Sequence, residues 1–207
     1  MDYKEWKPIY EEILQDFGYS KEQDIKAAKL LGELRGSDDL SILKEIEGSS
    51  VEVLGPFAER PTGDLILIAG SSISRVENVK ARTEFLVTDL DGDTALQKEK
   101  NLEGTTTFIH AHGDNIDLIR EWSTQFTGPV ISTCQCRPFD DVYNFGGFTD
   151  GDRCVFLADH FDAEKIILNG WDLTEPASKD GGTEIKKKKL RWASKLLRMV
   201  ETPITFK

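Results

Sequence analysis

The chain is predicted to fold as an α/β protein with a mostly parallel sheet that is covered by helices. Apolar residues among the first fifty positions recur at helical spacing. Short runs rich in β-branched residues begin near residue 50, and helical patterns separate several of them. Strands that alternate with helices form parallel sheets with both faces covered. We therefore expect an N-terminal helical segment, 1–49, packed on an α/β domain, 50–207.

Three helices are expected in the N-terminal segment. An apolar face runs through residues 6–17, and Gly18 marks the end of this helix, because glycine readily adopts the left-handed conformation that terminates helices. Ser20 and Gln23 have the spacing of a helix start, which predicts where the second helix begins. A third, short helix is expected to end before Gly48.

Six strands and three more helices are expected after residue 49. The strands cover 51–54, 65–69, 85–88, 106–109, 130–133 and 165–168, and the helices cover 116–126, 152–161 and 184–200. In open parallel sheets, ligands bind beyond the carboxyl ends of the strands. The residues that follow each strand are therefore the first candidates for a functional site.

The acidic composition argues against several classes of partner. A net charge of −11 at pH 7 makes most of the surface repel nucleic acid, so we expect no nucleic-acid partner. No apolar run approaches the roughly 20 residues that cross a bilayer, and the first residues lack the features of a signal peptide. The three cysteines are expected to be free and buried, which favours a cytoplasmic protein. The sequence leaves open whether the chain forms a homo-oligomer.

An acidic cluster follows the strand expected at 85–88. Asp89, Asp91 and Asp93 occupy alternate positions, and three carboxylates cannot all be buried without a counter-charge. Hard oxygen ligands are the kind that Mg²⁺ prefers in proteins. The alternative is a solvated acidic turn, but the position directly at a strand end favours a magnesium site.

A second polar segment follows the strand expected at 106–109. His110 and His112 alternate, so they share one face if the strand continues, and Asp114 brings another carboxylate to the same edge of the sheet. Asp114 or Asn115 is also a candidate cap for the next helix. Zinc is less favoured than magnesium, because a tetrahedral zinc site does not call for so many carboxylates.

A third polar segment combines paired glycines, acidic residues and an arginine. Glycines let a ligand approach the backbone closely, and a helix that starts at Thr149 or Asp150 would favour an anion at its N-terminus. The alternative is that this segment has no functional role and is a surface turn with an aspartate that caps the next helix. The candidates for substrate or phosphate contacts are Asn144, Gly146, Gly147, Thr149, Asp150 and Arg153.

Two further features have both a functional and an ordinary interpretation. The lysine run 186–189, with Arg191, is the only dense basic segment, and such runs are usually a solvated helix face. One of these lysines could instead hold a phosphate. Trp171 and Phe148 could stack on a flat heterocycle or simply pack in the protein.

Taken in order, these segments resemble the archaeal 6-hydroxymethyl-7,8-dihydropterin diphosphokinase family, which is distantly similar to thiamine pyrophosphokinases. The similar segments are 87–92, 110–115, 144–153 and the lysine-rich start of the last helix, and together they span residues 50 to 195. Two places depart from the family pattern. Phe57 stands where a small hydroxyl residue is expected, and Gly70 and Ser71 stand where an aspartate is expected.

The resemblance implies transfer of a diphosphate group from ATP to the hydroxymethyl group of a reduced pterin, with release of AMP. It also implies Mg²⁺, a role in folate or tetrahydromethanopterin biosynthesis, and a catalytic role for domain 50–207. Asp89, Asp91 and Asp114 would then be metal ligands, and Asp114 or His112 would take or orient the hydroxyl proton. The remaining phosphate or substrate contacts would include Asn115 and Lys189.

Three alternatives stay open at the level of the sequence. A phosphatase of the haloacid dehalogenase type would use Asp89 as a nucleophile, although Asp93 replaces the threonine of that signature. A non-catalytic module would bind a nucleotide or pterin without consuming it. A third possibility is the same diphosphate transfer with thiamine as the acceptor.

Overall fold

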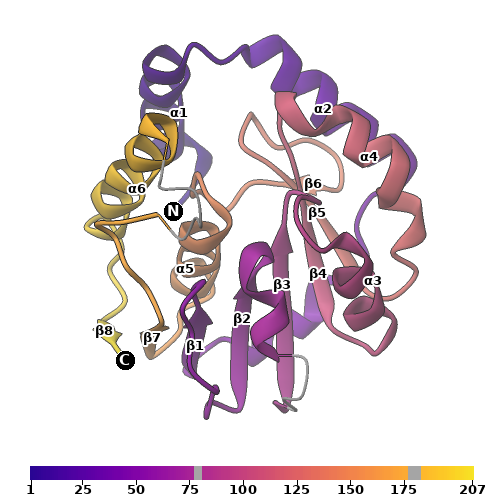
Figure 1. Ribbon diagram of the computed structural model, residues 1–207. Helices are drawn as coiled ribbons and strands as arrows, with labels where there is room; N and C mark the ends of the chain where they lie inside the picture. Colours follow the sequence, from indigo (N-terminus) through magenta and orange to yellow (C-terminus); the bar gives the residue numbers. More distant parts are fainter. Residues whose placement is uncertain (77–80, 177–182) are drawn as a thin grey trace.

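The computed structural model describes residues 1–76, 81–176 and 183–207, and a parallel sheet lies at its centre (Figure 1). The eight strands are ordered β6-β5-β4-β3-β2-β1-β7-β8, and every neighbouring pair is parallel. The strands are β1 Ser50–Leu54, β2 Leu65–Ala69, β3 Thr83–Thr88, β4 Thr106–Ala111, β5 Val130–Cys134, β6 Val142–Tyr143, β7 Lys165–Asn169 and β8 Ile204–Phe206. The predicted α/β class is confirmed, and the described sheet is parallel throughout.

Helices cover both faces of this sheet. The helices are α1 Tyr3–Phe17, α2 Lys21–Leu34, α3 Thr94–Leu102, α4 Ile116–Trp122, α5 Asp150–His160 and α6 Glu184–Leu197, with 3₁₀-helices η1 Leu40–Glu45, η2 Gly70–Val76, η3 Gly113–Asn115 and η4 Ser123–Gln125. One face packs on α5 and η1, and the other packs on α2, α3, α4 and η2. Helices α1 and α6 lie side by side next to α5 (Figure 1). No described helix is long and apolar enough to cross a membrane.

The predicted helix boundaries near the N-terminus are confirmed. Asp2 caps α1, and Gly18 ends it with a left-handed φ of 70°. The side chain of Ser20 accepts a hydrogen bond from the backbone N–H of Gln23, which starts α2. The third helix is the 3₁₀-helix η1, and all three cysteines are free and buried, as expected.

One α-helix and two strands were not predicted, and each has a weak pattern. Helix α3 has a buried face that is mostly polar and includes Gln97 and Asn101, so it lacks an apolar stripe. Strands β6 and β8 have only two and three residues. Both lie at the edges of the sheet, where one neighbour is enough to define them.

The N-terminal helices are joined to the sheet by buried hydrogen bonds. The indole nitrogen of Trp6 donates to the carbonyl of Gln135, 2.9 Å away, at the end of β5. Asp24 of α2 accepts from Tyr10 of α1 and from the backbone N–H of Gly113 beyond β4. These bonds fix the turn between α1 and α2 against the carboxyl edge of the sheet. The domain boundary near residue 49 stays a prediction.

Replacing Gly170 should destabilise the protein more than replacing Gly18, although both residues have a left-handed backbone. A Cβ at Gly170 would lie 2.0 Å from the backbone nitrogen of Ala58, whereas a Cβ at Gly18 would meet nothing within 4 Å. Gly18→Ala should cost about 1 kcal/mol of unfolding free energy from backbone strain alone. Gly170→Ala should cost about 3 kcal/mol or more, because overpacking adds to the strain. Urea unfolding measures both values, and equal losses would contradict this packing.

Candidate active site

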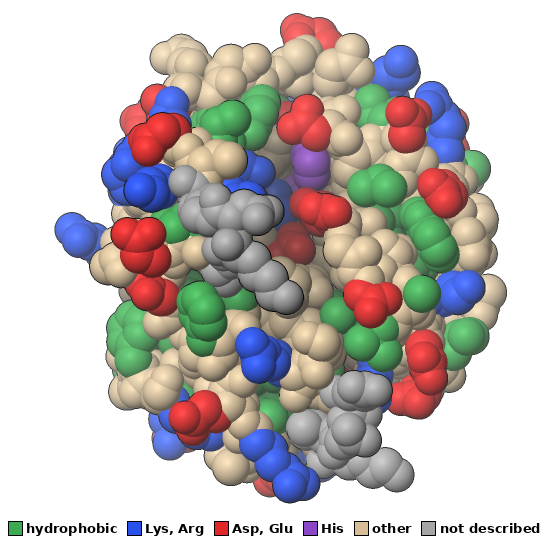
Figure 2. All heavy atoms as spheres, in the orientation of Figure 1, with side chains coloured by type: hydrophobic (Ala, Val, Ile, Leu, Met, Phe, Trp, Pro, Cys, Tyr) green, Lys and Arg blue, Asp and Glu red, His purple; other side chains and the backbone are tan. Residues whose placement is uncertain are grey.

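A cavity of about 990 Å³ opens at the carboxyl edge of the sheet. Its walls are the segments that follow β1, β2, β3, β4, β5 and β7, the first turn of α5, one face of α6 and the turn between α1 and α2. In Figure 2, acidic, basic and histidine side chains gather around a hollow in the upper half of the molecule. The predicted site residues that line the cavity are Asp89, Asp91, His112, Asp114, Thr149, Asp150, Arg153 and Lys189.

The turn after β3 brings two carboxylates into the cavity. Leu90 has a left-handed φ of 67°, which is unfavourable for a leucine, but its side chain is buried and its N–H donates to Oγ1 of Thr88 at 2.9 Å. The amide of Asn115 donates to the carbonyl of Asp89 at 2.8 Å. These contacts hold the turn so that Asp89 and Asp91 reach the cavity from one short segment.

Asp93 does not line the cavity and instead supports the fold at the start of α3. Its carboxylate accepts from the backbone N–H of Leu96 at 3.1 Å and caps helix α3. The three alternate aspartates therefore divide into two that line the cavity and one that starts a helix. This division agrees with an acidic turn in which only part of the cluster has a chemical role.

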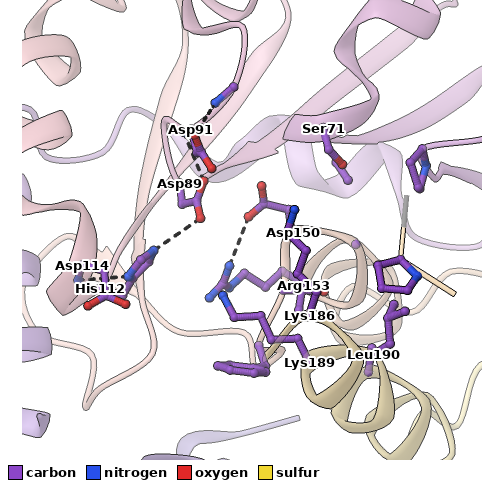
Figure 3. Close-up of a pocket in the computed structure, with 18 of the residues that line it drawn as sticks. Ser71, Asp89, Asp91, His112, Asp114, Asp150, Arg153, Lys186, Lys189 and Leu190 are labelled. Carbon is purple, nitrogen blue, oxygen red and sulfur yellow. Dashed lines mark hydrogen bonds and ion pairs between the residues drawn. The ribbon is translucent and has the colours of Figure 1, made fainter. Parts of the chain in front are cut away.

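His112 orients the Asp89 carboxylate. Nδ1 of His112 accepts from the backbone N–H of Asp114 at 3.2 Å, so its proton lies on Nε2, which faces Oδ2 of Asp89 at 3.4 Å (Figure 3). Burial alone would raise the pKa of Asp89, but the hydrogen bond from His112 and the positive charge of Arg153 lower it to about 2. Both nitrogens of His112 are thus engaged.

Asp150 faces Asp89 from the first turn of α5 (Figure 3). Its Oδ1 accepts from Nη1 of Arg153 at 3.1 Å. Burial and the negative charge of Asp89 raise the pKa of Asp150 to about 8, against the opposing effect of Arg153. A Cβ at Gly70 would lie 2.9 Å from Oδ2 of Asp150. The Asp150 carboxylate therefore lies beside the turn after β2, where the sequence itself has no aspartate.

These carboxylates fit a cation that arrives with its ligand. Among residues 1–76, 81–176 and 183–207, no group of three or more histidine, cysteine or acidic side chains is arranged to hold a metal ion alone. Mg²⁺ usually binds one or two carboxylates and takes its other ligands from water and substrate phosphates. Asp89, Asp91 and Asp150 line the cavity and are the candidates for the one or two carboxylates of such a site. Asp114, which is exposed at the cavity rim, stays a predicted ligand.

Basic side chains also line the cavity. Arg153 is almost fully buried, and Lys186 and Lys189 of α6 also line the cavity. Lys189 Nζ lies 5.8 Å from the ring centroid of Phe148. Lys188 instead pairs with Asp16 of α1 at 2.8 Å. The lysine run thus has two functions, since part of it joins two helices and part of it faces the cavity.

Four predicted contact residues lie behind the cavity instead of lining it. They are Asn115, Asn144, Gly146 and Gly147. Asn144 bonds the carbonyl of Cys136 and the N–H of Gly146. Gly147 has a φ of 88°, and a Cβ there would lie 2.6 Å from Cα of Arg153. The paired glycines therefore let this loop pack tightly on the first turn of α5.

The predicted helix starts are partly right. Thr149 begins α5, and its hydroxyl and backbone N–H both donate to Asp152. Asn115 occupies the N-cap position of α4, as one of the two expected candidates, but its side chain makes no capping hydrogen bond there. Asn115 instead accepts from the backbone N–H of His112 and donates to the carbonyls at the ends of β3 and β4. It joins the two turns that carry the acidic and histidine segments.

Gln135 is a buried amide of the cavity wall that was not predicted from the sequence. Gln135 follows β5, lines the cavity, and donates from Nε2 to Oδ2 of Asp24 at 2.8 Å. Asp24 also accepts from Tyr10 at 2.6 Å and from the N–H of Gly113 at 2.7 Å. Because Asp24 requires a donor, Gln135 turns its carbonyl oxygen away from it. The sequence signal that could have pointed to Gln135 was its partner Asp24, a single aspartate on the buried face of the second helix.

Asp150 should make stability depend on pH in metal-free buffer. Its pKa rises from 3.8 to about 8 on folding, so the folded protein retains a proton that the unfolded chain releases. This contribution is fully present below pH 3.8 and disappears as pH rises through about 8. Relative to Asp150→Asn, the wild-type protein should therefore lose melting temperature between pH 4 and pH 8 and then level off. A difference that does not vary with pH would contradict the assignment.

Comparison with known proteins places the chain in a family. Residues 60–177 match the family described as 6-hydroxymethylpterin diphosphokinase MptE-like. A protein of Methanocaldococcus jannaschii named 6-hydroxymethyl-7,8-dihydropterin pyrophosphokinase is 34% identical, and the alignment covers 99% of this chain and 98% of that protein. A Pyrococcus furiosus protein of the same name is 36% identical, with 97% and 95% covered.

A third archaeal relative gives the same result. The protein of that name from Methanothermobacter thermautotrophicus is 29% identical, with 97% of this chain and 96% of the relative covered. These matches decide against the haloacid-dehalogenase-type phosphatase, while the expected similarity to thiamine pyrophosphokinases stays a prediction. The chain belongs to the MptE-like 6-hydroxymethylpterin diphosphokinases, a family of diphosphate-transferring enzymes.

Proposed function

We propose that this protein transfers a diphosphate group from ATP to the hydroxymethyl group of 6-hydroxymethyl-7,8-dihydropterin and releases AMP. The observation that carries the proposal is one cavity that is lined both by the carboxylates of Asp89, Asp91 and Asp150 and by the basic side chains of Arg153 and Lys189. Its volume of about 990 Å³ is enough for a nucleotide and a bicyclic heterocycle together. The names of the relatives support the same acceptor. We place the protein in the cytoplasm, in folate or tetrahydromethanopterin biosynthesis.

We propose that Mg²⁺ accompanies the nucleotide and is held by Asp89, Asp91 and Asp150. The reason is electrostatic, because Asp89 lies against Asp150 and raises its pKa, and a cation between them relieves this repulsion. When bound, the ion supplies neutralisation of the phosphate charge and alignment of the transferred group.

The side chains of the protein position the reacting groups. Arg153 of α5, whose planar fork suits phosphate oxygens, and Lys189 of α6 hold the triphosphate. The acceptor oxygen forms a bond to the β-phosphorus as the bond between that phosphorus and the α-phosphate oxygen breaks, so AMP leaves. The hydroxyl proton passes to a carboxylate, and we assign this role to Asp114, because both nitrogens of His112 are engaged.

The pterin ring is proposed to lie near the turn between α1 and α2. Tyr19 and Phe148 line the cavity there, with ring centroids 6.5 Å apart, and offer flat apolar surface. The oxygen of Gln135 is an acceptor whose direction Asp24 sets. A pterin carries N–H donors along one edge of its ring, so an oriented acceptor beside aromatic side chains suits this substrate.

Replacing Gln135 should weaken pterin binding selectively. Gln135→Leu removes the acceptor and should raise KM for the pterin about tenfold, the effect of one lost hydrogen bond, with little change in KM for ATP. Tyr10→Phe is the matched control, because it also removes a donor to Asp24 but Tyr10 does not line the cavity. If the two variants change pterin KM equally, the effect comes through Asp24 and the proposed contact is wrong.

The reaction itself is tested by its products. The protein is incubated with ATP, Mg²⁺ and 6-hydroxymethyl-7,8-dihydropterin, with thiamine in a parallel sample, and nucleotides are separated. We expect AMP to form in step with a pterin diphosphate. Formation of ADP would indicate transfer of a single phosphate. Binding of ATP without turnover would support a non-catalytic module. Formation of AMP with thiamine alone would show that thiamine, and not the pterin, is the acceptor.

Asp91→Asn and Asp93→Asn form a matched pair in the same turn. Asp91 lines the cavity, whereas Asp93 caps α3, and asparagine is also a good helix cap. We expect Asp91→Asn to lower kcat by about a hundredfold or more, as loss of a charged group at the phosphates would. Asp93→Asn should stay within a few-fold of wild type, and both should melt normally. Equal losses of kcat would rule out the assignment of Asp91 to the cation.

A further inference from the structure

Two buried polar atoms behind the main cavity have no hydrogen-bond partner among the described residues. They are Nε2 of His110 and Nε of Arg153. Both residues line a second cavity of about 20 Å³, whose other walls include Phe108, Phe145 and Leu157. Buried polar groups nearly always have a partner, so two such atoms at one small cavity require an explanation.

The hydrogen bonds of His110 fix which of its nitrogens carries the proton. Oγ1 of Thr133 donates to the carbonyl of Ile109 at 3.2 Å, so it accepts from Nδ1–H of His110 at 3.0 Å. Burial, with the positive charge of Arg153, keeps the pKa of His110 well below its usual range. The ring is therefore neutral, and its Nε2 is an acceptor.

The two atoms are complementary to one water molecule. Nε of Arg153 can only donate, and Nε2 of His110 can only accept in this tautomer. A water molecule can accept from one and donate to the other, and about 20 Å³ is enough space for one. We infer that a single bound water joins Arg153 to His110, which makes His110 a positioning residue for the phosphate-binding arginine.

This link completes the support of Arg153. Its Nη1 donates to Asp150 at 3.1 Å, and the backbone of Gly147 packs against its Cα. The bridging water holds Nε from the side away from the main cavity. The guanidinium plane is then fixed before a substrate arrives, which lowers the entropic cost of binding a phosphate. His110 acts on the substrate only through Arg153, and this last step depends on the proposed function.

The pair His110→Gln and His110→Asn separates positioning from packing. Glutamine places an acceptor near the position of Nε2, whereas asparagine retains a bond to Thr133 but is too short to reach the water. We expect His110→Asn to weaken ATP binding in the presence of Mg²⁺ about tenfold, and His110→Gln to stay within about threefold of wild type, by isothermal titration calorimetry. Similar melting temperatures for the two variants would show that packing is not responsible.

A crystal structure at high resolution tests the water directly, without reference to activity. We expect an ordered water about 2.7–3.2 Å from both Nε of Arg153 and Nε2 of His110 in the wild-type protein. Density showing no water there, or equal loss of ATP affinity in both variants, would overturn the inference. If the wild-type protein binds no ATP, the proposed function fails, and the crystallographic result still decides whether the water is present.

Discussion

The close approach of two carboxylates, Asp89 and Asp150, is the constraint on which the rest of the site depends. Like charges that lie close together repel, and the raised pKa of Asp150 reflects its burial and the negative charge of Asp89, whereas His112 and Arg153 keep the pKa of Asp89 low. His112 stabilises the ionised form of Asp89, and Arg153 stabilises that of Asp150. A cation and a polyphosphate would complete this arrangement of charge, which is why the site suits diphosphate transfer.

The parallel sheet makes this approach possible. Asp89 follows β3, and Asp150 begins α5, which crosses the face of β1, β2 and β3. Asn115 donates hydrogen bonds to the end of β3 and to the end of β4, so it joins the acidic turn to the histidine turn. Gly70 leaves space for the Asp150 carboxylate beside β2. Gly70 and the buried amide of Asn115 thus help to position the charged residues of the site.

Much of this arrangement was predictable from sequence, because polar segments at strand ends meet at one edge of a parallel sheet. The positions of Asp89, Asp91 and His112 follow from that rule. The opposition of Asp150 to Asp89 does not, since it depends on how α5 crosses the sheet. Helix α3 was missed because its buried face carries Gln97, whose amide bonds within the site turn in place of apolar packing.

The central claim is that Asp89, Asp91 and Asp150 share one divalent cation with the nucleotide. The most direct test is a crystal structure with Mn²⁺ and a non-hydrolysable ATP analogue, in which anomalous scattering locates the ion. We predict a peak within ligand distance of Asp89, Asp91 and Asp150 and of phosphate oxygens of the analogue, and its loss in Asp150→Asn. A peak beside Asp114 and His112 that leaves Asp150 paired only with Arg153 would contradict the account.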